Sequence, residues 1–227
     1  MSARIYPRAG DIDPKIIARF RGVLLDVVCR LLDNDRIADP AIKPLGAGRP
    51  SIIGPAVTVA AAPGDFTSAI VATAVAKRGD VILVSGGGSD SFPCWGGGLT
   101  FAADALGCEG VAIDGTVVDS RFILDCATPV FCRGSSLRHT TMRPAGSVNV
   151  PIVWGGVAAE AGDLVLGDRD GICILPRSRM LEILVQAEET SGRIRESLAH
   201  MRVTGDSLFD LYGGRGFTDA AEMTWVE

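Results

Sequence analysis

The stretch that decides the fold is residues 79–98, which read GDVILVSGGGSDSFPCWGGG. It contains a four-residue apolar run, Val81 to Val84, with a Gly-Asp pair before it and glycines after it. An apolar run of this length between turn signals is typical of a strand buried on both faces. The second glycine run, Gly96 to Gly98, leads into an apolar segment that ends at Gly107. The stretch therefore predicts a strand, a glycine loop and the start of a helix.

Helices and strands alternate on both sides of this stretch. The patterns predict strands at residues 54–62, 110–113 and 129–132, and helices at 65–76, 99–106 and 120–126. Such alternation is typical of an α/β fold with a parallel sheet. One further helix is predicted at about residues 13–32, where Asp13 offers an N-cap and Pro14 the first helical position. Another is predicted at about residues 179–201, followed by a polar tail.

The pattern changes after Asn149. Short apolar runs at 150–153, 157–159, 163–166 and 171–175 are separated by glycine-rich turns, as in a β-sandwich or barrel. The segment 168–171 suits a hairpin turn. Because no internal repeat or low-complexity tract divides the chain, we expect residues 1–227 to form a single domain.

Composition excludes several classes of protein. With 227 residues, of which 47% are hydrophobic, the chain can bury a full core. The chain has a net charge of -5, and its sequence shows no basic stripe of the kind that phosphate contacts need. We therefore expect no nucleic-acid partner. Neither a signal peptide nor an apolar run long enough to cross a membrane is visible, which predicts a cytoplasmic protein with no membrane partner. The six cysteines form no CxxC pair and are expected to be reduced and mostly buried.

The glycines at 96–98 are the first candidate for a binding site. The first backbone N–H groups of a helix have no intrahelical partners, so they can bind a carboxylate or phosphate. The sequence fits neither the phosphate-loop nor the dinucleotide-binding pattern, so a nucleotide is not specifically indicated. A tight turn packed against Trp95 is the competing interpretation.

Two carboxylates flank the turn after the predicted strand at 110–113. Asp114 stands in an Asp-Gly pair and is also explained as a turn residue, whereas Asp119 has no such local role. Ligand-binding carboxylates are common at this edge of α/β sheets. The chain has only two histidines, which disfavours a His-rich zinc site or a Ser-His-Asp triad. A carboxylate and water site for Mg²⁺ or Mn²⁺ is the better prediction.

Four arginines follow in the same region. A guanidinium fork is the natural partner of a dicarboxylate or a 2-oxo acid, although solvated surface arginines are more common. The four are Arg121, Arg133, Arg138 and Arg143.

Taken together, these motifs resemble the RraA-like family of metal-dependent aldolases. The order and spacing of the motifs match from about Gly54 to the last helix. The residues that carry the resemblance are 79–84, Gly86–Gly88, Trp95-Gly96, Gly107, Gly110, Asp114-Gly115, Asp119, 129–131, 149–152, 155–157, Gly162-Asp163 and 168–176.

The resemblance implies a fold, an assembly and an activity. Family members are similar to the swivelling β/β/α domains and assemble as trimers, or as hexamers of paired trimers, with the active site between neighbouring subunits. Their aldolases include those that act on 4-hydroxy-4-methyl-2-oxoglutarate. They cleave 4-hydroxy-2-oxo dicarboxylic acids to pyruvate and a second oxo acid, and many decarboxylate oxaloacetate. Mg²⁺ or Mn²⁺ stabilises the pyruvate enolate by Lewis-acid catalysis.

The resemblance also implies roles for individual residues. Asp119 matches the family's metal-binding aspartate. The amides of Gly98 and Leu99 match those that hold the substrate carboxylate, next to Gly96 and Gly97. A glutamate on the neighbouring subunit's last helix supports the metal-bound water in the aldolases. Three residues fall near its place: Glu188, Glu189 and Ser191.

Three positions depart from the family pattern. Val118 stands where an arginine grips the substrate, Gly97 where the aldolases have an acidic residue, and Ser85 where an aspartate is common. Losing a guanidinium that pairs with a carboxylate typically weakens transition-state binding by several kcal/mol. Arg121 follows Val118 by about one helical turn, so it is the candidate replacement.

Three functions are consistent with these observations. The first is a divalent-metal-dependent carbon–carbon lyase of the aldolase or decarboxylase type, acting on a small 2-oxo or hydroxy carboxylic acid through Asp119 and Arg121. The second is a scaffold recruited to hydration, isomerisation or ring opening, because Gly97 and Val118 would make the pocket larger and more apolar. The third is a non-catalytic regulator of a ribonuclease, like RraA itself.

Overall fold

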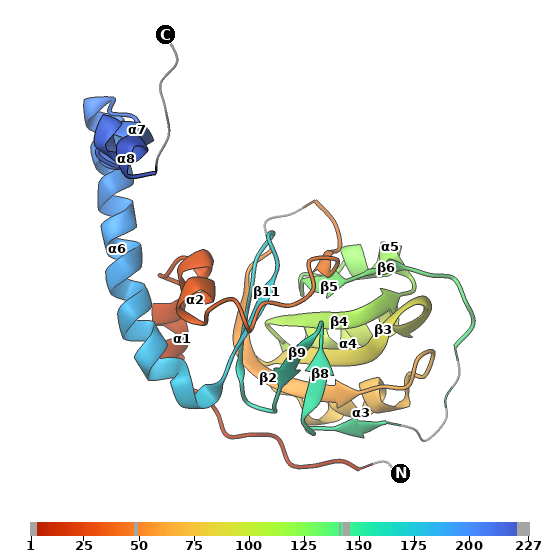
Figure 1. Cartoon of the computed structure of the whole chain (residues 1–227). Helices are drawn as coiled ribbons and strands as arrows, with labels where there is room; N and C mark the ends of the chain where they lie inside the picture. The colour runs from red at the N-terminus through yellow and green to blue at the C-terminus, as the bar shows by residue number, and fades with distance from the viewer. Residues whose placement is uncertain (1–3, 48–49, 141, 143–145, 222–227) are drawn as a thin grey trace.

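A mixed sheet forms the centre of the molecule in a computed structural model of the chain (Figure 1). The structure describes residues 4–47, 50–140, 142 and 146–221. The strands lie in the order β1-β5-β4-β3-β2-β10-β11, with β6 added beside β4 and β7 beside β2. The nine strands of this sheet are β1 (Lys43–Pro44), β2 (Ile52–Ala60), β3 (Val81–Trp95), β4 (Gly110–Val117), β5 (Val130–Cys132), β6 (Gly134–Ser135), β7 (Ser147–Val148), β10 (Leu164–Gly167) and β11 (Ile172–Leu175).

The middle of the sheet is parallel and its flank is antiparallel. Strands β2, β3, β4 and β5 pair in parallel, whereas β10 pairs antiparallel with both β2 and β11. The parallel strands are almost continuously apolar because both of their faces are covered. The observed architecture confirms the predicted α/β class.

Three apolar clusters hold the layers together. Helices α3 (Thr67–Val75) and α4 (Gly97–Leu106) cover one face of the parallel strands. The β8–β9 hairpin (Ile152–Trp154 and Val157–Ala159) covers the other, and its Trp154 ring donates a hydrogen bond to the Val84 carbonyl at 3.1 Å. Helices α1 (Pro14–Phe20), α2 (Leu25–Leu31) and α6 (Met180–Thr204) pack on β10 and β11.

The C-terminal helix leaves the body of the molecule. The first half of α6 buries Ile183, Leu184 and Ala187, but its second half is largely exposed. It extends away from the sheet with α7 (Leu208–Leu211) and α8 (Arg215–Ala220) at its far end (Figure 1). No helix within the described residues is long and apolar enough to span a membrane.

Three sequence predictions about the fold were wrong. The glycine loop expected after Val84 is part of β3, which continues to Trp95 with register shifts against β4. The helix expected at about residues 13–32 is two helices, because the chain turns at Arg21 and Gly22 before α2 begins. The strands after Asn149 do not form a separate sandwich or barrel, because β10 pairs with β2 and thereby extends the main sheet. The hairpin turn at 168–171 was predicted correctly, and the Asp168 N–H donates to the Gly171 carbonyl at 3.0 Å.

Candidate functional site

The N-terminus of α4 forms one side of the candidate site. Gly96 is the N-cap, and no side chain caps the helix. The first intrahelical bond runs from the Thr100 N–H to the Gly96 carbonyl, at 3.0 Å. The buried Trp95 indole donates to the Thr100 hydroxyl at 2.8 Å, and this bond ties the end of β3 to the first turn of the helix. The amides of Gly97, Gly98 and Leu99 precede this first bond, so they are the ones available to an anion.

Asp119 forms the facing side of the site. It follows β4 and is the N-cap of α5 (Ser120–Leu124), with φ 61° and ψ 40° in the left-handed region. Aspartate and asparagine adopt this conformation more readily than most residues. Asp119 is exposed, and its carboxylate makes no hydrogen bond with the described part of the chain. One carboxylate oxygen would lie 3.7 Å from a Cβ at Gly96, so the carboxylate stands beside the start of α4.

Val118 closes the gap between β4 and α4. Its N–H donates to the Trp95 carbonyl at 3.0 Å, which holds the backbone of Val118 beside β3. Its Cγ1 would lie 3.0 Å from a Cβ at Gly96. The position where the family has an arginine therefore presents an apolar surface directly over the N-cap.

Gly97 does not enlarge the site. A Cβ at this position would lie 2.8 Å from the Cβ of Phe122 and 3.1 Å from that of Asp119. Glycine at position 97 was expected to make the pocket larger. That expectation was wrong, because α5 already occupies the space that a side chain at Gly97 would fill. Sequence reasoning did not identify Phe122, although its position three residues after Asp119 on a predicted helix placed it on the same side.

We expect Gly97→Ala to destabilise the protein by about 1–3 kcal/mol, because α4 or α5 must shift to admit the methyl group. Gly98→Ala is the matched control, since a Cβ at Gly98 meets no atom within 4 Å. In that helical position alanine should stabilise by about 0.5–1 kcal/mol. Urea denaturation of both variants measures the difference. Equal effects of the two substitutions would show that α4 and α5 do not meet as described.

Asp114 and Arg133 have structural roles that account for their side chains. Asp114 is buried; one oxygen accepts from Arg133 Nε at 2.7 Å and the other from the Gly155 N–H at 3.0 Å. Arg133 also contacts the Asp39 carboxylate at 2.8 Å. Burial of Arg133 opposes its charge, but these two carboxylates raise its pKa overall. Neither Asp114 as a metal ligand nor Arg133 as a substrate clamp fits this arrangement.

The other arginines are spread out. Arg138 lies over the Phe92 ring, 5.3 Å from its centre. Arg121 is exposed on α5 and makes no interaction with the described part of the chain, so it is free to bind a ligand. Arg143 lies outside the described residues. Ser85 donates from its hydroxyl to the Val153 carbonyl at 2.8 Å, which ties β3 to the β8–β9 hairpin.

Three positions on α6 were considered for a glutamate that reaches a neighbouring subunit. Glu188 is paired with Arg19 at 2.6 Å within its own chain. The buried Ser191 hydroxyl accepts from the Leu24 N–H at 3.0 Å. Glu189 is exposed and makes no interaction with the described residues, so it alone of the three is available.

The residues present offer a divalent cation few protein ligands. Within the described part of the chain, no three His, Cys, Asp or Glu side chains gather closely enough to hold a metal ion. Asp119 supplies one accessible carboxylate to the candidate site. Mg²⁺ suits such a site because it commonly keeps several waters and binds one or two carboxylates together with its substrate. The donor set therefore fits Mg²⁺ or Mn²⁺ held by Asp119, water and substrate, and does not fit a zinc site.

Comparison with known proteins identifies the family of this chain. The sequence model of the RraA-like family, described as Aldolase/RraA, matches residues 23–174. A Halalkalibacterium halodurans protein named "Putative 4-hydroxy-4-methyl-2-oxoglutarate aldolase" is 32% identical over 173 residues, which cover 76% of this chain and 82% of that protein.

Two solved structures share the fold. RraAS2 of Streptomyces coelicolor, titled an unusual member of the RNase ES inhibitor RraA protein family, matches with a TM-score of 0.75 and 24% identity. The match covers 83% of this chain and 98% of that one. The RNA-processing inhibitor RraA from Thermus thermophilis matches with a TM-score of 0.59 and 26% identity, over 66% of this chain and 90% of that one. The match to the family and the identity to its members show that this chain belongs to the RraA-like family.

Proposed function

We propose that this protein is a divalent-metal-dependent carbon–carbon lyase of the aldolase or decarboxylase type, acting on a small 2-oxo or hydroxy carboxylic acid. One observation carries the proposal: the Asp119 carboxylate, which has no partner among the described residues, stands beside the uncapped N-terminus of α4. A carboxylate substrate on the amides of Gly98 and Leu99 would bring a second negative charge next to Asp119. A divalent cation between them relieves that repulsion, which favours a metal at this place.

The chain's own residues bind and orient the substrate. The α4 amides hold one carboxylate group and so fix the adjacent oxo carbon relative to Asp119. When bound, the divalent cation supplies Lewis-acid stabilisation of the negative charge that develops on the oxo oxygen as the carbon–carbon bond breaks. Val118 and Phe122 present apolar surface next to these groups. Arg121 is free to pair with a second carboxylate at the far end of the substrate.

The proposed enzyme works as a trimer or a pair of trimers. A single chain leaves Asp119 and Gly98 exposed, so the site is open. The exposed second half of α6 projects from the body of the molecule (Figure 1) and is suited to reach a neighbouring subunit. Glu189 lies in the first half of α6 and is exposed, and it is the side chain that would contribute to the neighbouring site. We place such an assembly in the cytoplasm.

Metal removal tests the proposal. The purified protein is incubated with oxaloacetate and with 4-hydroxy-4-methyl-2-oxoglutarate, and pyruvate release is followed with a coupled dehydrogenase. We expect turnover that is lost in excess chelator and restored by Mg²⁺ or Mn²⁺. Full turnover in chelator, with metal content verified as negligible, would contradict a metal-dependent lyase.

A second function is favoured by the contact between Gly97 and Phe122. Because no acidic side chain fits at Gly97, the proton transfers that such a residue assists in the aldolases need another group. The same anion and metal arrangement would then serve hydration, isomerisation or ring opening of a related acid. A profile of 2-oxo, hydroxy and unsaturated acids separates the two enzyme functions. Absence of turnover across the profile, together with tight binding to a ribonuclease, would instead favour a regulator.

A further inference from the structure

Exposed apolar side chains border the candidate site. The Cγ1 of Val118 would lie 3.0 Å from a Cβ at Gly96, and the Cβ of Phe122 would lie 2.8 Å from a Cβ at Gly97. Phe122 is 64% exposed, although it belongs to a helix that contacts α4. The start of α4 is therefore flanked by a valine and by a phenylalanine that is open to solvent.

Phe101 extends this apolar surface along α4. It lies one turn after Gly97, and residues four apart share a helix face. Because Gly97 faces Phe122, Phe101 lies on the side of α4 that faces α5, and it is 70% exposed. We call Val118, Phe122 and Phe101 the apolar strip. The described part of the chain leaves both phenylalanines of the apolar strip largely uncovered.

The charged groups around the apolar strip favour an uncharged group against it. The Cβ of Asp119 would lie 3.1 Å from a Cβ at Gly97, on the side that Phe122 also faces. A substrate carboxylate placed on the strip would lose water without gaining a hydrogen-bond donor from Val118 or Phe122, and the Asp119 carboxylate would repel it. Arg121 projects about 100° around α5 from Phe122, so a carboxylate bound by Arg121 lies off the strip.

We infer that the acid processed at this site carries an apolar branch, an aryl or branched alkyl group, on the carbon that becomes the carbonyl carbon of the second product. This inference rests on the proposed function, in which the amides of Gly98 and Leu99 hold the first carboxylate. In a 4-hydroxy-2-oxo acid that carbon is C4, three bonds from the carboxylate carbon. A branch there can reach the side chains beside Gly96 and Gly97, and the apolar strip binds it.

The reaction on such an acid is a retro-aldol cleavage. The C4 hydroxyl loses its proton, the C3–C4 bond breaks, and C4 becomes the carbonyl carbon of an apolar aldehyde or ketone. The electron pair of the broken bond passes to C3 and forms the enolate of pyruvate, which takes up one proton. With a phenyl branch, 4-hydroxy-2-oxo-4-phenylbutanoate gives pyruvate and benzaldehyde, and the cleavage needs no oxidant or other co-reactant.

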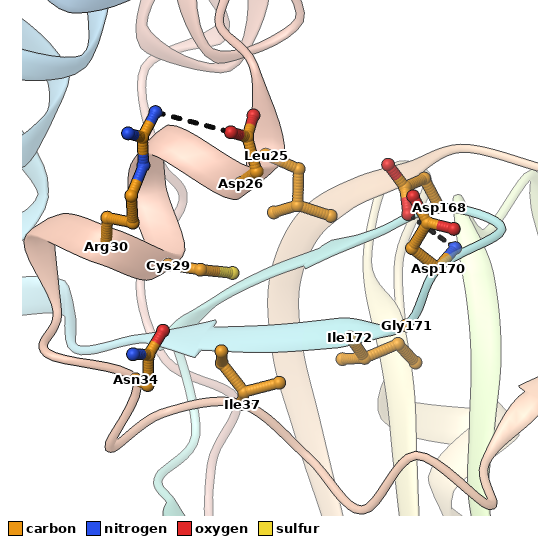
Figure 2. Close-up of a pocket in the computed structure, with 10 residues that line it drawn as sticks. All are labelled: Leu25, Asp26, Cys29, Arg30, Asn34, Ile37, Asp168, Asp170, Gly171 and Ile172. Carbon is orange, nitrogen blue, oxygen red and sulfur yellow. Dashed lines mark hydrogen bonds and ion pairs between the residues drawn. The ribbon is translucent and has the colours of Figure 1, made fainter. Parts of the chain in front are cut away.

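Figure 2 shows a hollow elsewhere in the molecule that does not compete for such an acid. It occupies about 330 Å³ between α2 and the β10–β11 hairpin, and Asp26, Asp168 and Asp170 line it. Arg30 also lines the hollow, but its guanidinium pairs with Asp26 at 3.3 Å. Because the three carboxylates repel an anion, we expect an oxo acid to bind once per chain.

Titration calorimetry with acids that cannot be cleaved measures the effect of the apolar strip apart from turnover. 2-Oxo-4-phenylbutanoate and 2-oxobutanoate both lack the C4 hydroxyl and differ only in the phenyl group. With Mg²⁺ present, we expect the wild-type protein to bind the phenyl acid at least about tenfold more tightly. Phe122→Ala should reduce this ratio of affinities to below about threefold, because most of the apolar surface under the branch is removed.

Leu124→Ala is the matched control on the same helix. Leu124 is 56% exposed, but its Cδ2 would lie 2.7 Å from a Cβ at Gly46, so it faces the loop after β1 and not α4. The ratio of affinities should keep its wild-type value in this variant. Pyruvate release gives the matching kinetic test. The kcat/KM for 4-hydroxy-2-oxo-4-phenylbutanoate should exceed that for 4-hydroxy-2-oxopentanoate about tenfold in the wild-type protein and in Leu124→Ala, but not in Phe122→Ala.

The outcomes separate this inference from the proposed function. Pyruvate release with equal kcat/KM for the two cleavable acids, or equal affinities for the two others, would overturn the apolar branch and leave the lyase standing. A preference for the phenyl acid in binding, without pyruvate release from either cleavable acid, would support the branch and contradict the lyase. No measurable binding of either acid would contradict both. If Phe122→Ala alters the oligomeric state in size-exclusion chromatography but not the ratio of affinities, the strip is a contact between subunits and the inference is wrong.

Discussion

Replacing Asp119 with asparagine is expected to lower kcat/KM for the oxo-acid substrate about a thousandfold, because the single carboxylate available to the metal is lost. Asparagine is the informative substitution because it tolerates the left-handed conformation of Asp119, at φ 61°, almost as well as aspartate. Alanine would add backbone strain to the loss of charge. Initial rates over a range of Mg²⁺ concentrations, together with a thermal melt, measure the effect.

The comparison with Arg121→Ala separates a metal ligand from a substrate clamp. If Arg121 pairs with a distant carboxylate, its loss should raise KM about tenfold with little change in kcat. Asp119→Asn should instead lower kcat and weaken the response to Mg²⁺. The melting temperature should stay unchanged, because the side chain is exposed and makes no interaction with the residues that the structure describes. Near-normal kcat/KM in Asp119→Asn would remove Asp119 from the mechanism.

Replacing Asp80 with alanine is expected to destabilise the protein by about 3 kcal/mol. Asp80 is fully buried at the start of β3 and binds the Arg8 guanidinium with both oxygens, at 2.6 Å from Nε to Oδ2. Its carboxylate also accepts from the Lys77 N–H at 2.8 Å. The substitution leaves the Arg8 guanidinium and the Lys77 N–H without the Asp80 carboxylate as their acceptor. We expect the lower end of the usual range because Asp11 still contacts Arg8.

An exposed ion pair supplies the control for Asp80. Arg19 and Glu188 are 46% and 38% exposed, so Arg19→Ala should leave the urea midpoint almost unchanged. Arg8→Met combined with Asp80→Ala should be less destabilising than the sum of the single substitutions, because neither charge is then left alone. Equal midpoint shifts for Asp80→Ala and Arg19→Ala would show that the buried pair does not anchor the N-terminal segment.

Periodicity and turn chemistry predicted the core of the fold well. The apolar run at Val81–Val84 and the glycines at the start of α4 have strong local signals, because a buried strand segment and a helix start depend on adjacent residues. The turn within the first predicted helix escaped prediction, because one glycine in an apolar pattern is compatible with a continuous helix. The pairing of β10 with β2 also escaped, because it joins residues more than 100 positions apart.

The sequence by itself determined the α/β class and the family, and it predicted the two elements of the candidate site: the glycines at the start of α4 and Asp119 after β4. Each of these depends on local composition and order along the chain. Only the tertiary structure decided that Phe122 fills the space beside Gly97 and that Asp114 and Arg133 bind each other. Those contacts join segments whose packing depends on the shape of the whole core, and no local pattern encodes it.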